Sequence, residues 1–115
     1  MENTTATQIL ETAIKAANGR TCDRADAAQL ANILPHLQEM DRDTYLAVRA
    51  LWRSRYAELS ALSRQTKRSR KDDRGLSQSR VHAIKWDARR FMAVRFALRV
   101  AARARAAAAV AAVAA

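Results

Sequence analysis

Residues 45–71, YLAVRALWRSRYAELSALSRQTKRSRK, decide the fold, because they hold neither glycine nor proline and repeat apolar side chains every three or four residues. This period is typical of one face of an α-helix. The apolar stripe along that face consists of Tyr45, Val48, Trp52, Tyr56, Leu59 and Leu62. We therefore expect a helix over 44–71, with Asp41 or Asp43 as its N-terminal cap.

A second long helix is expected over 78–105, where the same period continues. Its apolar side chains are Val81, Ile84, Ala88, Phe91, Val94, Leu98 and Ala101. Gly75 lies in the short segment between the two stretches, and long helices joined by a short loop normally fold back antiparallel. The pattern predicts a helical hairpin with limbs at 44–71 and 78–105, followed by an alanine-rich C-terminal extension over 106–115.

Residues 1–40 predict two short, acidic helices. Thr5 and Gln8 match a capping box, in which both side chains bind free backbone N–H groups at a helix start. Asp23 is the expected cap of the second helix, and Pro35 is expected to stop this helix or to start the next turn. We expect both helices to pack across one end of the hairpin.

The predicted fold class is all-α, with a single domain over 1–105. A chain of 115 residues supports one modest core. Its two glycines and one proline leave few positions for the turns that a sheet needs. The expected architecture is therefore two short N-terminal helices packed on a long antiparallel helical hairpin.

Charge is distributed unevenly along the chain. Residues 1–47 carry seven acids and four bases, a net charge of −3, whereas residues 48–115 carry four acids and seventeen bases, a net charge of +13. Of the 21 basic residues, 17 are arginine, whose planar guanidinium group binds phosphate or carboxylate through two N–H donors. The C-terminal part is therefore expected to bind an anionic partner.

Residues that catalyse reactions or bind metals are scarce. Cys22 is the only cysteine, which excludes an intrachain disulfide and a cysteine metal cluster and favours a reducing cytoplasm. Neither His36 nor His82 belongs to a catalytic or metal-binding motif. Residues 106–115 are too few to span a bilayer, and alanine anchors weakly on its surface. We expect a cytoplasmic non-enzyme with no cofactor, metal or membrane contact.

The basic residues that we expect to bind nucleic acid form two groups. One lies near the hairpin tip and the other along one flank of the last helix, and Arg90 and Arg95 widen the positive surface. Each phosphate that they neutralise would release a condensed counterion. No helix-turn-helix spacing is present, so no reading of base sequence is expected. The two groups are Arg64, Lys67, Arg68, Arg70 and Lys71 at the tip, and Lys85, Arg89, Arg99 and Arg103 on the flank.

Two other interpretations of the arginines stay open. They can form the solvated face of a thin helical bundle. They can also belong to a protein-binding module, such as a phage- or plasmid-encoded inhibitor or adaptor that docks on an acidic surface of a host protein, because arginine is enriched at protein interfaces.

Trp52 and Trp86 are expected to pack in a core or a dimer interface rather than against nucleic-acid bases, because the chain has few other large apolar side chains. A lone hairpin would leave much of its apolar stripes exposed. We therefore expect a homodimer.

Overall fold

The structure, a computed structural model, describes residues 4–18, 26–38, 40–72 and 78–114, with the side chains of 4, 66–72 and 78–80 excepted. The described residues form four α-helices and one 3-10 helix, and they contain no strand. The all-α prediction is therefore confirmed. The elements are α1 (Thr4–Ala16), α2 (Ala27–Ile33), η1 (Leu34–His36), α3 (Arg42–Asp72) and α4 (Gln78–Ala114).

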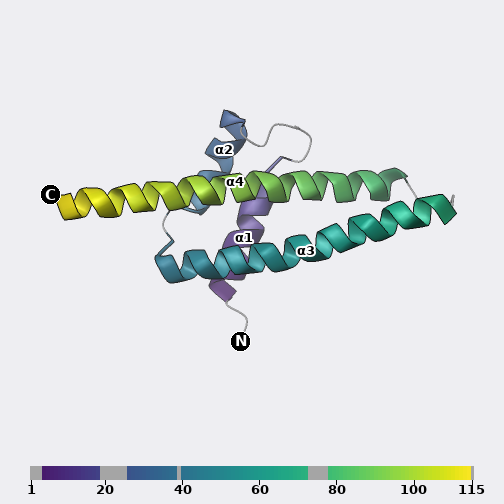
Figure 1. Ribbon diagram of the computed structural model, residues 1–115. Helices are drawn as coiled ribbons and strands as arrows, with labels where there is room; N and C mark the ends of the chain where they lie inside the picture. Colours follow the sequence, from purple (N-terminus) through teal and green to yellow (C-terminus); the bar gives the residue numbers. More distant parts are fainter. Residues whose placement is uncertain (1–3, 19–25, 39, 73–77, 115) are drawn as a thin grey trace.

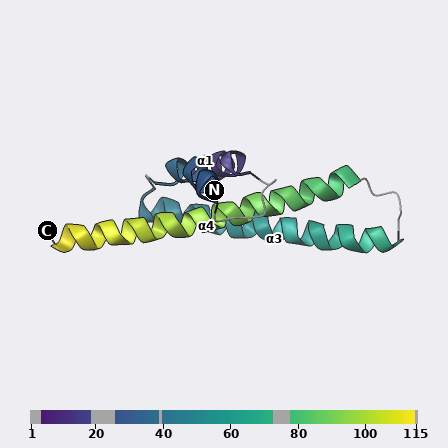
Figure 2. The same cartoon turned by 90° about the horizontal axis from the view of Figure 1, so that it is seen from above.

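The long helices α3 and α4 lie side by side and run in opposite directions (Figures 1 and 2). α3 begins two residues before the expected start at residue 44. α4 continues without a break through the alanine-rich segment to Ala114, since alanine has the strongest helix propensity. Its C-terminal end projects past the start of α3 (Figure 1), where Val110 is 70% and Val113 is 89% exposed.

The starts of the short helices differ from the sequence-based expectation. α1 already includes Thr5, the expected cap. Asp26, and not Asp23, caps α2, because the backbone N–H of Gln29 donates to Asp26 Oδ1 at 3.0 Å; Asp23 lies outside the described residues. Both aspartates suit a cap by residue type, so composition alone could not distinguish them. Pro35 is the second residue of the 3-10 turn η1, which begins at Leu34, directly after α2 ends at Ile33.

The core lies where α1 packs on the first part of α3 and on α4, and where α2 and η1 pack on α4. Its largest fully buried side chains are Leu10, Ile33, Leu37, Val48 and Val94. Buried alanines on α1 and α4 have little bulk, so these helices can approach closely. Figure 2 shows α1 on one side of the pair formed by α3 and α4. The opposite side of the pair is left uncovered by the short helices.

Asp41 caps α3, as one of the two expected alternatives, and its carboxylate accepts the Thr44 backbone N–H at 2.7 Å. Hydrogen bonds from the Thr44 side chain and backbone lower the pKa of Asp41, and the positive charge of Arg105 adds to the effect. A carboxyl with a lowered pKa in the folded state binds protons more tightly once the chain unfolds. Its contribution to stability is therefore complete above the ordinary pKa of aspartate and is lost as the pH falls through the lowered value.

We predict that Asp41→Asn removes this part of the acid dependence of stability, because asparagine caps helices as well as aspartate does but does not titrate. The measurement is urea unfolding of both proteins from neutral pH down through the pH range where aspartate titrates. The two free energies of unfolding should be similar after protonation of Asp41 and should diverge above its pKa. If the free energies of unfolding of the two proteins changed with pH in parallel, the charge of Asp41 would not contribute to stability.

Candidate functional site

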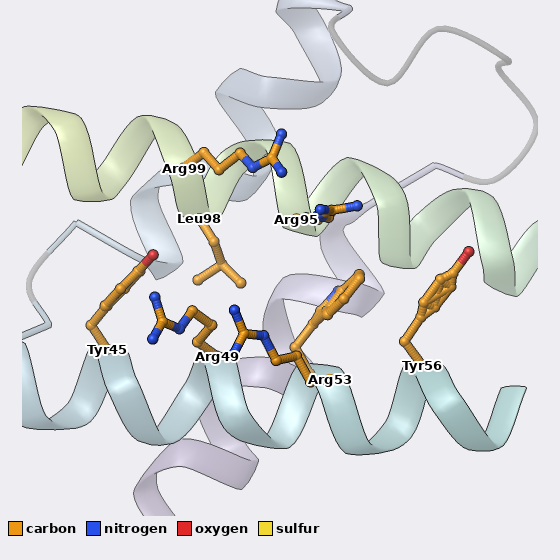
Figure 3. Close-up of a pocket in the computed structure, with 8 residues that line it drawn as sticks. Tyr45, Arg49, Arg53, Tyr56, Arg95, Leu98 and Arg99 are labelled. Atoms are coloured by element: carbon orange, nitrogen blue, oxygen red, sulfur yellow. The ribbon is translucent and has the colours of Figure 1, made fainter. Parts of the chain in front are cut away.

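A groove with a volume of about 400 Å³ lies between α3 and α4, on the side of the pair away from α1 (Figure 3). Arginines from both helices surround aromatic and aliphatic side chains there, and none of the lining residues is acidic. Figure 3 shows Arg49 and Arg53 rising from α3 and Arg95 and Arg99 extending from α4. The lining residues are Tyr45, Arg49, Trp52, Arg53, Tyr56, Arg95, Leu98 and Arg99.

The aromatic floor of the groove is held in place by contacts between α3 and α4. Trp52 is 7% exposed, and its Nε1–H donates to the backbone carbonyl of Phe91 at 2.8 Å. Tyr56 packs edge to face on Trp52, with ring centroids 4.8 Å apart, and stacks on Phe91 at 6.2 Å. These contacts fix the floor before any ligand binds.

The aromatic rings also position the arginines. The Arg95 guanidinium carbon lies 5.8 Å from the centroid of the Trp52 ring. Tyr45 has Arg49 at 5.8 Å and Arg105 at 4.7 Å from its ring centroid. A guanidinium group over a ring keeps the N–H donors at its edge available for an anion. Ordering of these long side chains in advance lowers the entropy cost of binding.

The groove arginines are not neutralised by acids in the described part of the chain. Arg55 pairs with Glu11 and Arg90 pairs with Asp87, each at 3.6 Å. Neither pair includes an arginine that lines the groove. Like charges gathered in a concave surface produce a positive potential that attracts anions.

The groove continues toward the far end of α3 as a second hollow of about 220 Å³, which also borders Tyr56. Its other lining residues are small, aliphatic or hydroxyl-bearing, apart from Arg64 near its end. From Tyr45 to Arg64 the helix rises about 28 Å, at roughly 1.5 Å per residue. The hollows together form the α3–α4 groove, with five arginines along its length: Arg49, Arg53, Arg64, Arg95 and Arg99.

Comparison of the chain with protein-family models, with curated proteins and with solved structures found no match. No helix in the described part has a segment long and apolar enough to cross a membrane. Within those same residues, no three histidine, cysteine or acidic side chains gather as a metal site would require. The α3–α4 groove and the charged surface beside it are therefore the candidate functional site.

The structure distributes the sequence-predicted site residues over three places. Arg99 and Arg64 line the α3–α4 groove. Lys85 and Arg103 are exposed and Arg89 is half-buried on the outer flank of α4. The remaining four lie in the last turns of α3, and their side chains are outside the described residues: Lys67, Arg68, Arg70 and Lys71. Their binding roles stay predictions.

Sequence reasoning did not include Arg49, Arg53 and Arg95 among the site residues. The first two are spaced four residues apart beside the aromatic positions of α3, and Arg95 has the same spacing to Arg99 on α4. Such pairs lie on one helix face. Their meeting in one groove depends on how α3 and α4 align, which the local pattern does not specify.

The two tryptophans have different surroundings. Packing is confirmed for Trp52, whose ring is buried between α3 and α4. Trp86 is 39% exposed, with the His82 ring 6.1 Å away. Trp86 therefore does not pack in the core of a single chain, and the other expected place for it, a dimer interface, stays a prediction. Trp86 lies on α4 and does not line the groove.

Proposed function

We propose that this protein is a non-enzymatic, cytoplasmic nucleic-acid-binding protein with a regulatory or architectural role, and that it holds phosphate groups in the α3–α4 groove. One observation carries the proposal. Four arginines without an acidic partner among the described residues surround an aromatic floor, and no acid lines the groove.

Phosphate is the anion that suits this arrangement best. Guanidinium groups bind phosphate oxygens through paired N–H donors, and successive phosphates along a nucleic acid can engage arginines spread along the groove. Arg99 also lies one helical turn from Arg103, which is exposed on the outer flank of α4. The proposed binding surface therefore extends from the groove onto that flank.

The architecture proposed for this role is a helical hairpin of α3 and α4 braced by the two short N-terminal helices. The brace includes the fully buried Leu10 and Val48 and the Arg55 to Glu11 ion pair between α3 and α1. Such bracing keeps the arginines of the two long helices at fixed relative positions. Fixed arginine positions suit the binding of a ligand. A binding role is also favoured over a catalytic one because the groove lining has no carboxylate, histidine or thiol that could act as a general base or nucleophile.

A homodimer remains part of the proposal. Within one chain, Trp52, Val94 and Leu98 are already buried. A second copy is therefore less necessary to cover the apolar stripes than the sequence indicated. A second copy could cover the large apolar side chains that are exposed in one chain, which among the described residues are Leu46, Trp86, Val110 and Val113.

The proposal predicts binding of short random-sequence oligonucleotides that weakens steeply with salt. If the four arginines of the first hollow each neutralise one phosphate, the logarithm of the association constant should fall against the logarithm of salt with a slope magnitude of about 2.8 on single strands or about 3.6 on B-DNA, and more with flank contacts. Fluorescence anisotropy at a series of salt concentrations measures this slope. Absence of binding at low salt would contradict the proposal and favour the adaptor that docks on an acidic host protein.

A further inference from the structure

We infer that the ligand of the α3–α4 groove is a single-stranded stretch of nucleic acid, with phosphates on the arginines and a base against Tyr56. This inference rests on the proposed function and adds the class of nucleic acid. Two features carry it: the concave form of the site between two helices, and the aromatic side chains along its floor.

Access to the aromatic floor distinguishes a single strand from a duplex. In a duplex the bases are paired and stacked inside, and the phosphates form the outer surface. A duplex could therefore contact arginines at the rim, but its bases could not reach Tyr56 between the helices. An unpaired strand presents both its phosphates and the flat faces of its bases, which is the combination that basic grooves with aromatic side chains bind.

Tyr56 is half-buried and borders both hollows of the groove. Its ring is supported by Phe91, which stacks on it with an interplanar angle of 26°, and by the edge contact with Trp52. Trp52 is itself buried. Tyr56 therefore lies at the centre of the groove as a supported ring that a base can stack on.

Positive charge lies on both sides of the Tyr56 ring along the groove. Arg53 lies three residues before Tyr56 and Arg64 eight residues after it on α3, and both line the groove. Arg95 contributes positive charge from α4. A strand that follows the groove would therefore have arginines on both sides of the base at Tyr56, while the serines at positions 60 and 63 offer hydroxyl groups along the second hollow.

The test compares a mixed-sequence single strand, as DNA and as RNA, with the duplex of the same sequence at one salt concentration. We expect at least one single strand to bind more tightly than the duplex. Duplex binding equal to or tighter than both single strands would overturn this inference and leave the proposed function intact. Failure of all three ligands to bind would overturn both the inference and the proposed function. Polyglutamate that bound as tightly as the single strands would also overturn the inference, because the groove would then accept any polyanion.

Variants at Tyr56 supply the second arm of the test. Tyr56→Leu keeps an apolar side chain but removes the ring, and we expect single-strand binding to weaken about fivefold or more, because stacking of one base on an aromatic side chain is lost. The salt slope should not change, since the phosphate contacts remain. Tyr56→Phe keeps the ring and should bind as the unmodified protein does.

Trp86→Leu is the matched control, because it removes an exposed aromatic side chain outside the groove. Circular dichroism verifies that each variant is folded. Unchanged single-strand binding by folded Tyr56→Leu would overturn the inference, as would an equal loss in Trp86→Leu.

Discussion

Replacement of Arg49, Arg53, Arg95 and Arg99 by glutamine should weaken single-strand binding about 200-fold at roughly 0.15 M salt, and should lower the magnitude of the salt slope by about 2.8. The reason is that each phosphate contact on a single strand contributes about 0.7 to the slope through counterion release. The affinity figure assumes that the non-electrostatic part of the binding free energy is unchanged. Glutamine is a good helix former, so α3 and α4 should keep their helicity.

Two comparison variants test whether the effect belongs to the groove. Lys15→Gln combined with Arg42→Gln removes two exposed charges outside the groove and should change the slope little. Replacement of Lys85, Arg89 and Arg103 by glutamine tests the outer flank of α4. A folded groove variant with an unchanged slope would contradict the groove assignment, and a dominant effect of the flank variant would move the binding site to the outside of α4.

Trp52→Ala should destabilise the fold by about 3–5 kcal/mol, because it removes a buried ring and leaves a cavity between α3 and α4. The hydrogen bond to the Phe91 carbonyl is lost as well. A domain of this size has a free energy of unfolding of about 5–15 kcal/mol, so a large part of the stability would disappear. The midpoint of thermal unfolding should fall by roughly 10–20 °C, as circular dichroism can measure.

Trp86→Ala is the internal control for this effect, since the same residue type is replaced at a position that is 39% exposed. We expect a change within about 1 kcal/mol, as is usual for surface substitutions. A loss of stability as large as that of Trp52→Ala would contradict the exposure of Trp86 in the folded chain. If that loss depended on protein concentration, it would indicate that Trp86 lies in a dimer interface.

The helices of this protein are predictable because the signals that specify them are local. The apolar period over 45–71 and the aspartate at position 41 together locate α3 to within about two residues. Alanine propensity likewise indicates a helical end of α4. These features depend on residues three or four positions apart, so the local sequence specifies them.

The α3–α4 groove is less predictable because it depends on tertiary register. Trp52 and Phe91 meet across 39 positions of sequence, and only this alignment brings Arg53 near Arg95 around one aromatic floor. A shift of α4 along α3 by one turn would bring different side chains together, although the hydrophobic pattern of each helix would be the same. The sequence therefore indicated a basic flank and an apolar stripe without showing that they share one site.

The projecting end of α4 divides this helix into two thermodynamic regions. Backbone hydrogen bonds near Val94 and Leu98 lie within the packed core and break only when much of the molecule unfolds. Beyond Arg105 the described residues of α4 are all exposed, so each turn there depends on the intrinsic helix–coil equilibrium of alanine. Amide hydrogen exchange along a single continuous helix therefore passes from globally controlled opening to local fraying within a few turns.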